Sequence, residues 1–262
     1  MKLQVREFGD YTGERPTLIL LHGLFGSSAN WHSIARTLAA REHLLVPDLR
    51  NHGRSPHHPA MDYPSMGVDL LQLIDEHGFD SVRLLGHSMG GKLAMWLAQA
   101  HPERVAGLVV VDIAPVVYPH RFDSIFGALN RLDLAHLTDR QQAHEQLQSS
   151  LPDAALRHYL LQNLLKDDGR WRWRMNLQGL EAAIADILDY PLPTGAHEYP
   201  GPALFIYGSQ SDYVRAAQQK RILQLFPQGR LRAIPDAGHW VYAEQPQAFL
   251  SALAPFLARR GT

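Results

Sequence analysis

Cysteine is absent from the 262-residue chain. The chain therefore has no disulfide, no thiolate nucleophile, and no zinc or iron–sulfur site built on cysteine. It has fifteen histidines, but no H-x-x-x-H pair beside an acidic base, so we expect no metal site. A lack of disulfides suits a reducing compartment, and we expect a cytoplasmic protein.

Long apolar runs and an excess of one charge are absent as well. No apolar run approaches the ~20 residues of a membrane span, and the first residues contain no apolar signal-peptide core. The formal net charge is -1, so nothing draws the chain electrostatically to nucleic acid or to an anionic membrane. We therefore expect neither a membrane span nor a nucleic-acid partner.

Apolar runs of strand length alternate with segments of helical spacing through the first 115 residues. Residues 17–21 and 105–111 are continuous apolar runs, as expected of parallel strands that are buried on both faces. The same pattern returns after residue 191. It predicts an α/β fold with a mainly parallel sheet and helices on both faces.

The alternation stops between residues 116 and 190, where we expect about four helices and no strand. We interpret this segment as a helical cap inserted into a core formed by residues 1–115 and 191–262. The run WRWR at 171–174 interleaves aromatic and basic residues, which is also a nucleic-acid signal. In a chain of near-zero net charge we assign it to packing within the cap.

Residues 86–90, GHSMG, contain the pattern G-x-S-x-G between a predicted strand and a predicted helix. In that context the pattern indicates a sharp turn that exposes a serine hydroxyl at the sheet edge. We expect Ser88 to be a nucleophile. Met89 would then begin the helix, where its backbone N–H can stabilise a substrate oxyanion.

A serine hydroxyl needs a base that a carboxylate holds in one tautomer. His239 is the best candidate for the base, because it follows the last predicted strand in a Gly-His turn. Two aspartates are candidates for the acid, and both keep the chain order Ser…Asp…His. Asp112 directly continues a predicted strand, which is the simpler geometry, and Asp212 is the alternative in the loop after the next strand.

The glycine loop after residues 17–21 can supply a second oxyanion donor, which we expect to be the backbone N–H of Leu24. Phe25 and Trp240 lie beside predicted catalytic residues in the sequence. We expect both to line an acyl-binding pocket, although an aromatic side chain at either place serves core packing equally well.

Five runs occur in the order and spacing of the α/β-hydrolase superfamily. They are HGLFGS (22–27), DLRNHG (48–53), GHSMGGK (86–92), VDIAP (111–115) and AGHWV (237–241). Together they resemble, more narrowly, the small bacterial carboxylesterases of the YbfF type, and the resemblance covers nearly the whole chain.

The resemblance implies a sheet of about eight strands, an all-helical cap, and hydrolysis of short- to medium-chain acyl esters or thioesters without a cofactor. It also favours Asp112 as the acid, because the matching VDIAP run carries the acid in that group. The wider superfamily more often places the acid after the following strand, where this chain has Asp212.

Other functions use the same constellation. A dehalogenase needs a carboxylate nucleophile where this chain has Ser88, which argues against it. An amidase, a C–C hydrolase and a perhydrolase or haloperoxidase would use the same triad, and a non-catalytic receptor would be expected to lose a triad member. The sequence therefore predicts a serine esterase with a small-molecule ester as its partner, and it is compatible with a homodimer.

Overall fold

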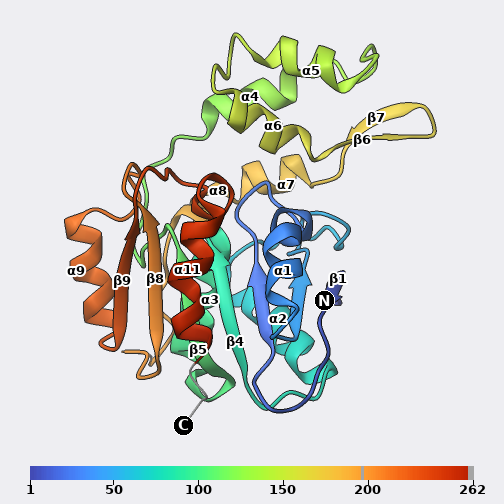
Figure 1. The fold of residues 1–262 in the computed structure, drawn as a ribbon. Helices are drawn as coiled ribbons and strands as arrows, with labels where there is room; N and C mark the ends of the chain where they lie inside the picture. The colour runs from blue at the N-terminus through green and yellow to red at the C-terminus, as the bar shows by residue number, and fades with distance from the viewer. Residues whose placement is uncertain (196–197, 259–262) are drawn as a thin grey trace.

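The computed structural model describes residues 1–195 and 198–258. Within them, the central sheet has seven strands in the order β1-β3-β2-β4-β5-β8-β9 (Figure 1). Edge strand β1 pairs antiparallel with β3, and every other neighbouring pair is parallel. The mainly parallel α/β fold is thus confirmed. The strands are β1 (Val5–Phe8), β2 (Leu18–Leu21), β3 (Leu44–Pro47), β4 (Val82–His87), β5 (Val105–Val111), β8 (Ala203–Gly208) and β9 (Gly229–Ile234).

Helices cover both faces of this sheet. They are α1 (His32–Leu38), α2 (Tyr63–Glu76), α3 (Met89–Ala100), α9 (Ala216–Leu225), α10 (Val241–Glu244) and α11 (Pro246–Leu257). No helix in the described ranges is both long enough and apolar enough to cross a bilayer.

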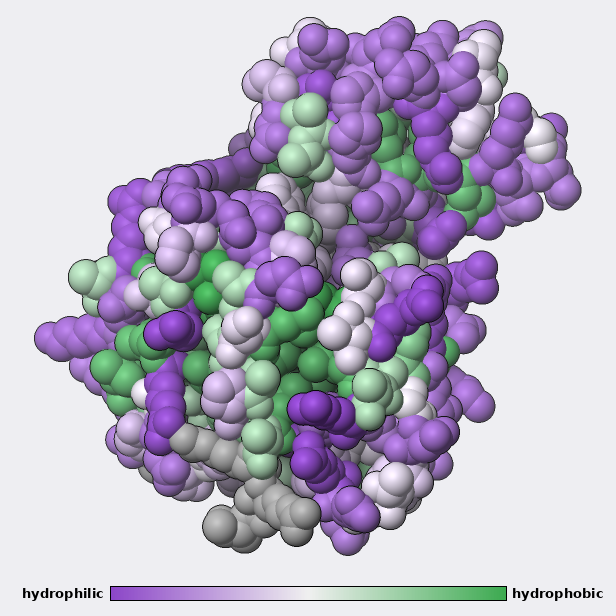
Figure 2. Space-filling view, viewed as in Figure 1, coloured by the Kyte–Doolittle hydropathy of each residue, from purple (hydrophilic) through white to green (hydrophobic). Residues whose placement is uncertain are grey.

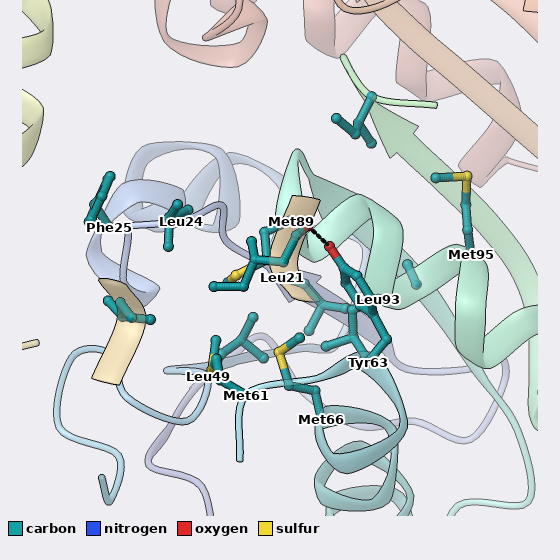
Figure 3. Packing of buried hydrophobic residues seen from close by; sticks show 14 of the residues in the cluster. Leu21, Leu24, Phe25, Leu49, Met61, Tyr63, Met66, Met89, Leu93 and Met95 are labelled. Carbon is teal, nitrogen blue, oxygen red and sulfur yellow. Dashed lines mark hydrogen bonds between the residues drawn. The ribbon is translucent and has the colours of Figure 1, made fainter. Parts of the chain in front are cut away.

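Strand β2 shows why the continuous apolar runs are needed. Successive side chains of a strand point to opposite faces, and Leu18 and Leu20 pack in the cluster formed with α1 and α11. Ile19 and Leu21 pack in the cluster that includes α2, α3 and α9. Figure 3 shows part of this second cluster, with Leu21 among side chains of α2 and α3. Both faces of β2 are therefore core.

Residues 116–190, called the cap segment below, connect β5 to β8. These two strands are neighbours in the sheet, so the cap segment leaves and re-enters the sheet at adjacent places. In Figure 1 its helices α4, α5 and α6 stand above the sheet, and Figure 2 shows mostly hydrophilic side chains on their outer surface. Its elements are α4 (Asp123–Arg131), α5 (Arg140–Leu147), α6 (Ala154–Leu161), β6 (Leu164–Asp167), β7 (Arg170–Trp173), α7 (Leu177–Ala182) and α8 (Ile184–Leu188).

The expectation of an all-helical cap segment is wrong, because β6 and β7 form an antiparallel hairpin. Asp168 and Gly169 make its turn with φ of 46° and 79°. Asp-Gly is the dipeptide that a tight hairpin turn prefers, so the sequence did contain a signal for it. Trp171 and Trp173 are half-buried and pack against the core cluster that includes α2, α3 and α9. This agrees with the packing role expected of the run at residues 171–174.

The main sheet of the described residues has seven strands, one fewer than the approximate number of eight that was expected. Only β1 precedes β2, and it already occupies the sheet edge beside β3. The connection between β1 and β2 contains Gly9 and Gly13, both with φ of 73°. A connection with two residues in the left-handed region forms turns rather than a further strand.

Candidate active site

Ser88 is the single residue between the end of β4 and the start of α3. Its backbone has φ 52° and ψ -119°, a region that costs a non-glycine residue roughly 1–3 kcal/mol and is found mainly at functional sites. The turn is tight enough to exclude side chains on both flanks. A Cβ at Gly86 would lie 2.1 Å from the Gly90 carbonyl oxygen, and one at Gly90 would lie 2.6 Å from that of His22.

Asp112 directly follows β5 and is fully buried. Its Oδ2 lies 2.7 Å from Nδ1 of His239, whose side chain is 19% exposed. A carboxylate can only accept at this distance, so Nδ1 carries the proton and Nε2 is left free to accept another. Asp112 thus holds His239 in the tautomer that a general base requires.

The Asp112 carboxylate accepts further hydrogen bonds. Its Oδ1 accepts the backbone N–H of Gly208 at 3.1 Å, and its Oδ2 also accepts the hydroxyl of Ser211. Hydrogen bonds of this kind replace the water that a buried carboxylate loses. The structure therefore explains how a charge is kept at this depth beside His239.

Asp212, the alternative acid, lies in the loop after β8 and lines the same cavity as His239, but within the described residues it makes no hydrogen bond to His239. Its side chain is 64% exposed and pairs with Arg215, and this hydrogen bond lowers the pKa of the Asp212 carboxyl. Its two neighbours enter the site instead: Ser211 reaches Asp112, and the ring of Tyr213 stacks on His239 at 4.1 Å. The sequence analysis missed both, although they flank a predicted site residue.

His87 holds the backbone of the candidate base. Its Nε2 lies 2.9 Å from the carbonyl oxygen of His239, so Nε2–H must be the donor. Complete burial keeps the pKa of His87 well below its usual value, and the ring is neutral. His87 therefore fixes the position of His239 without competing with it for a proton.

The loop after β2 lies against the serine. A Cβ at Gly23 would stand 3.2 Å from the Cβ of Ser88. The cap segment fixes this loop from outside: the Tyr159 hydroxyl donates to the Leu24 carbonyl at 2.8 Å, and Asn163 Nδ2 donates to the Phe25 carbonyl at 2.6 Å. The sequence analysis missed both contacts, which join residues more than a hundred positions apart.

A cavity of about 450 Å³ contains Ser88 and His239 in its wall. Its size is typical of small-molecule sites. The predicted lining residues Phe25 and Trp240 both contribute to it. They also pack on the cap segment, since Phe25 lies 5.3 Å from the Phe126 ring and Trp240 lies 5.4 Å from the Tyr159 ring. Further apolar lining comes from Phe122, Ile125, Leu156 and Leu188.

A family model described as the alpha/beta hydrolase fold matches residues 16–246. This chain belongs to the α/β-hydrolase fold family. The superfamily resemblance inferred from the sequence motifs is thereby confirmed.

Individual relatives within the α/β-hydrolases agree. The chain is 37% identical over 262 residues to esterase YbfF of Escherichia coli, covering 98% of this chain and 99% of that protein. It is 39% identical over 251 residues to the sn-1-specific diacylglycerol lipase ABHD11 of Mus musculus, covering 93% and 81% of the two chains. A solved structure titled marine microorganism esterase superimposes with a TM-score of 0.92 at 38% identity, covering 98% and 99%.

Lys92 is a residue of this α/β-hydrolase that the sequence analysis did not assign to the site. It lies on α3, one turn after Ser88, and is buried. Its Nζ donates to the carbonyls of Leu188 and Asp189 at 2.7 and 2.9 Å and stands 4.9 Å from the centre of the Tyr118 ring. Burial lowers its pKa to about 7. Lys92 thus ties the helix of the serine to both ends of the cap segment.

No group of three or more His, Asp or Glu side chains within residues 1–195 and 198–258 is arranged to hold a metal ion.

Three buried histidines around the site make the free energy of unfolding depend on pH. Burial lowers the pKa of His22 and His87, and that of His52 falls from 6.5 to about 3. As the pH falls through 6.5, the unfolded chain therefore binds these protons before the folded protein does. Stability is therefore complete above that pH and falls as the pH drops, and for His52 the loss is roughly 1 kcal/mol per pH unit.

Urea unfolding at about pH 7 and about pH 5.5 measures this loss, which we expect to be roughly 1 kcal/mol from His52, with His22 and His87 adding to it in the same direction. The exposed His136 gives the control, because His136→Asn should leave the pH dependence unchanged. A free energy of unfolding that stays constant between the two pH values would contradict the assignment of neutral buried histidines.

Proposed function

We propose that this α/β-hydrolase is a serine carboxylesterase that forms an acyl-enzyme through Ser88, His239 and Asp112. The observation that carries the proposal is the 2.7 Å pair between Asp112 and His239, together with the turn that places Ser88 in the wall of the same cavity. The names of the relatives, esterase and diacylglycerol lipase, support ester hydrolysis.

In the proposed acylation step, Ser88 Oγ attacks the ester carbonyl and His239 Nε2 takes its proton. The carbonyl oxygen becomes an oxyanion between the backbone N–H groups of Leu24 and Met89. Met89 is the first residue of α3, so its N–H has no acceptor within the helix. The C–O bond then breaks, and His239 gives its proton to the leaving alcohol.

The proposed deacylation step repeats this chemistry with water. His239 removes a proton from water as the oxygen attacks the acyl carbonyl, and then returns it to Ser88 Oγ as the acid leaves. Asp112 stays ionised throughout and stabilises the imidazolium that forms twice in each cycle.

We further propose that residues 116–190 act as a cap on a core of residues 1–115 and 191–262 and set the acyl-chain preference. Ile125 and Leu156 of the cap segment and Phe25 and Trp240 of the core line one cavity. Burying a methylene group contributes about 0.8 kcal/mol. Each added methylene should therefore raise kcat/KM by about fourfold until the cavity is filled.

A series of p-nitrophenyl esters from acetate to decanoate tests this function. We expect kcat/KM to rise with chain length, to pass through a maximum within the series and then to fall. Acyl thioesters of the same acids, measured in parallel, show which leaving group the site prefers. Failure to hydrolyse any ester of the series would overturn the proposed function.

A matched pair of leucine variants tests the role of the cap segment. Leu156→Ala enlarges the cavity and should move the maximum toward longer acyl chains. Leu223→Ala, at a residue that is 45% exposed outside the cavity, should leave the profile unchanged. An unchanged maximum in both variants would contradict the role given to the cap segment.

A further inference from the structure

A second cleft lies between the loop after β3 and the hairpin β6–β7, and it shares no lining residue with the catalytic cavity. Its volume is about 340 Å³. The polar part of its lining is largely cationic. Its lining residues include Arg54, Ser55, His57, Leu165, Arg172 and Arg174.

Positive charge is concentrated around Arg174. Partial burial and the nearby charges of Arg54, Arg140 and Arg6 lower the pKa of its guanidinium. The chain as a whole has a formal net charge of -1, so this concentration is a local feature and not a reflection of composition. A concave site lined by one sign of charge attracts counter-ions of the other sign.

Two acidic groups that bond to residues of the cleft are already engaged. Asp48 is buried and accepts the backbone N–H groups of Ser28 and Arg54, at 2.6 and 2.8 Å. Asp167 accepts two hydrogen bonds from Arg172, at 3.0 and 2.9 Å. These carboxylates lower the charge of the cleft but do not fill it.

The arginines around the cleft differ in the hydrogen bonds that their guanidinium groups make. The guanidinium of Arg140 donates to the carbonyl of Leu164. In contrast, the guanidinium groups of Arg54 and Arg174 have no hydrogen-bond acceptor within the described part of the chain. Two guanidinium groups with unused donors in one cleft have the chemistry of an anion site.

We propose that this cleft binds a small organic anion that bears a phosphate group, with Arg54 and Arg174 as its principal ligands. A phosphate offers several acceptor oxygens and up to two charges, which matches paired guanidinium forks better than one carboxylate does. Leu165 is half-buried in the wall and offers an apolar surface to the organic part. The concave shape favours a small molecule over a membrane surface.

The cleft is joined to the active-site loop through Asn163, by one backbone and one side-chain hydrogen bond. The N–H of Arg174 donates to the carbonyl of Asn163 at 2.8 Å, and Asn163 Nδ2 donates to the carbonyl of Phe25. The lining residues of the two sites are nevertheless different, so the binding proposal stands or fails independently of ester hydrolysis.

Isothermal titration with pyrophosphate at constant ionic strength tests the proposal directly. We expect saturable binding of one equivalent to the wild type, weakened at least about tenfold in Arg54→Gln/Arg174→Gln. The exposed pair Arg36 and Arg230 supplies a control with the same change of net charge, because Arg36→Gln/Arg230→Gln should bind as the wild type does. Equal binding by the two double variants, or no saturable binding by the wild type, overturns the proposal.

Two further experiments test the location of the site and the kind of ligand. Leu165→Glu places a negative charge in the cleft without removing an arginine, and it should also weaken pyrophosphate binding. Sedimentation with phosphatidylglycerol vesicles separates a free phosphate ligand from a lipid headgroup. Binding to vesicles without binding to pyrophosphate would contradict a small-molecule site.

Discussion

Ser88→Ala is expected to lower kcat for ester hydrolysis by about a millionfold, to a residual rate roughly 10³–10⁴-fold above the uncatalysed reaction. The reason is geometric. Ser88 is the residue whose backbone turns between β4 and α3 into the cavity that also holds His239. Without its hydroxyl no acyl-enzyme forms, and only substrate binding and the oxyanion donors remain.

The variant should fold as the wild type does, because alanine removes a single oxygen atom from a half-buried position. Thermal unfolding should therefore show little change in Tm. Ser251→Ala on the exposed side of α11 is the matched control and should keep full activity. A Ser88→Ala enzyme that retains more than about a hundredth of the wild-type rate would contradict the assignment of the nucleophile.

Asp112→Asn is expected to lower kcat by about ten-thousandfold, whereas Asp212→Asn should change it by less than about threefold. Asp112 accepts the Nδ1 proton of His239 and thereby leaves Nε2 free to act as a base. An amide at residue 112 can instead donate to Nδ1 and stabilise the other tautomer. Asp212 contacts Arg215 at the surface, so its loss should leave that tautomer unchanged.

The two variants have the same chemical change, which makes each the control for the other. Circular dichroism and thermal unfolding should show that both are folded. The profile of kcat/KM against pH adds a second measurement, because only Asp112→Asn should alter its acidic limb. If Asp212→Asn removed activity while Asp112→Asn kept it, the acid would be Asp212 and this account of the site would be wrong.

The sequence predicts the elements whose signal is local. Residues 18–21 are apolar without interruption because β2 is buried on both faces. The turn at Ser88 can be predicted because the backbone leaves no space for a side chain at residues 86 and 90, so both positions are glycine. In each case the constrained positions lie close together in the sequence, so the constraint is visible in the order of residue types, even where the contact that imposes it is distant.

Separating the two aspartates depends on information that is not local. Asp112 and Asp212 both follow strands that end at the same edge of the sheet. What distinguishes them is the direction of each carboxylate: Asp112 has φ of 52° and contacts His239, whereas Asp212 pairs with Arg215. A direction of this kind is fixed by tertiary contacts and leaves no pattern in the sequence.

Contacts between the cap segment and the core cannot be predicted from the sequence for the same reason. Tyr159 and Asn163 hold the backbone of the loop at Leu24 and Phe25. Both contacts use backbone carbonyls, which every residue type offers. Nothing in the local sequence therefore marks either side chain as part of the site.

The most direct test of the central claim is mass spectrometry of the protein after reaction with a p-nitrophenyl alkylphosphonate. Ser88 Oγ should attack phosphorus and release one equivalent of p-nitrophenol, leaving a stable adduct. We expect a single modified peptide that contains Ser88, and no modification in Ser88→Ala. An adduct on another residue, or rapid ester hydrolysis by an enzyme that never forms the adduct, would contradict the proposed mechanism.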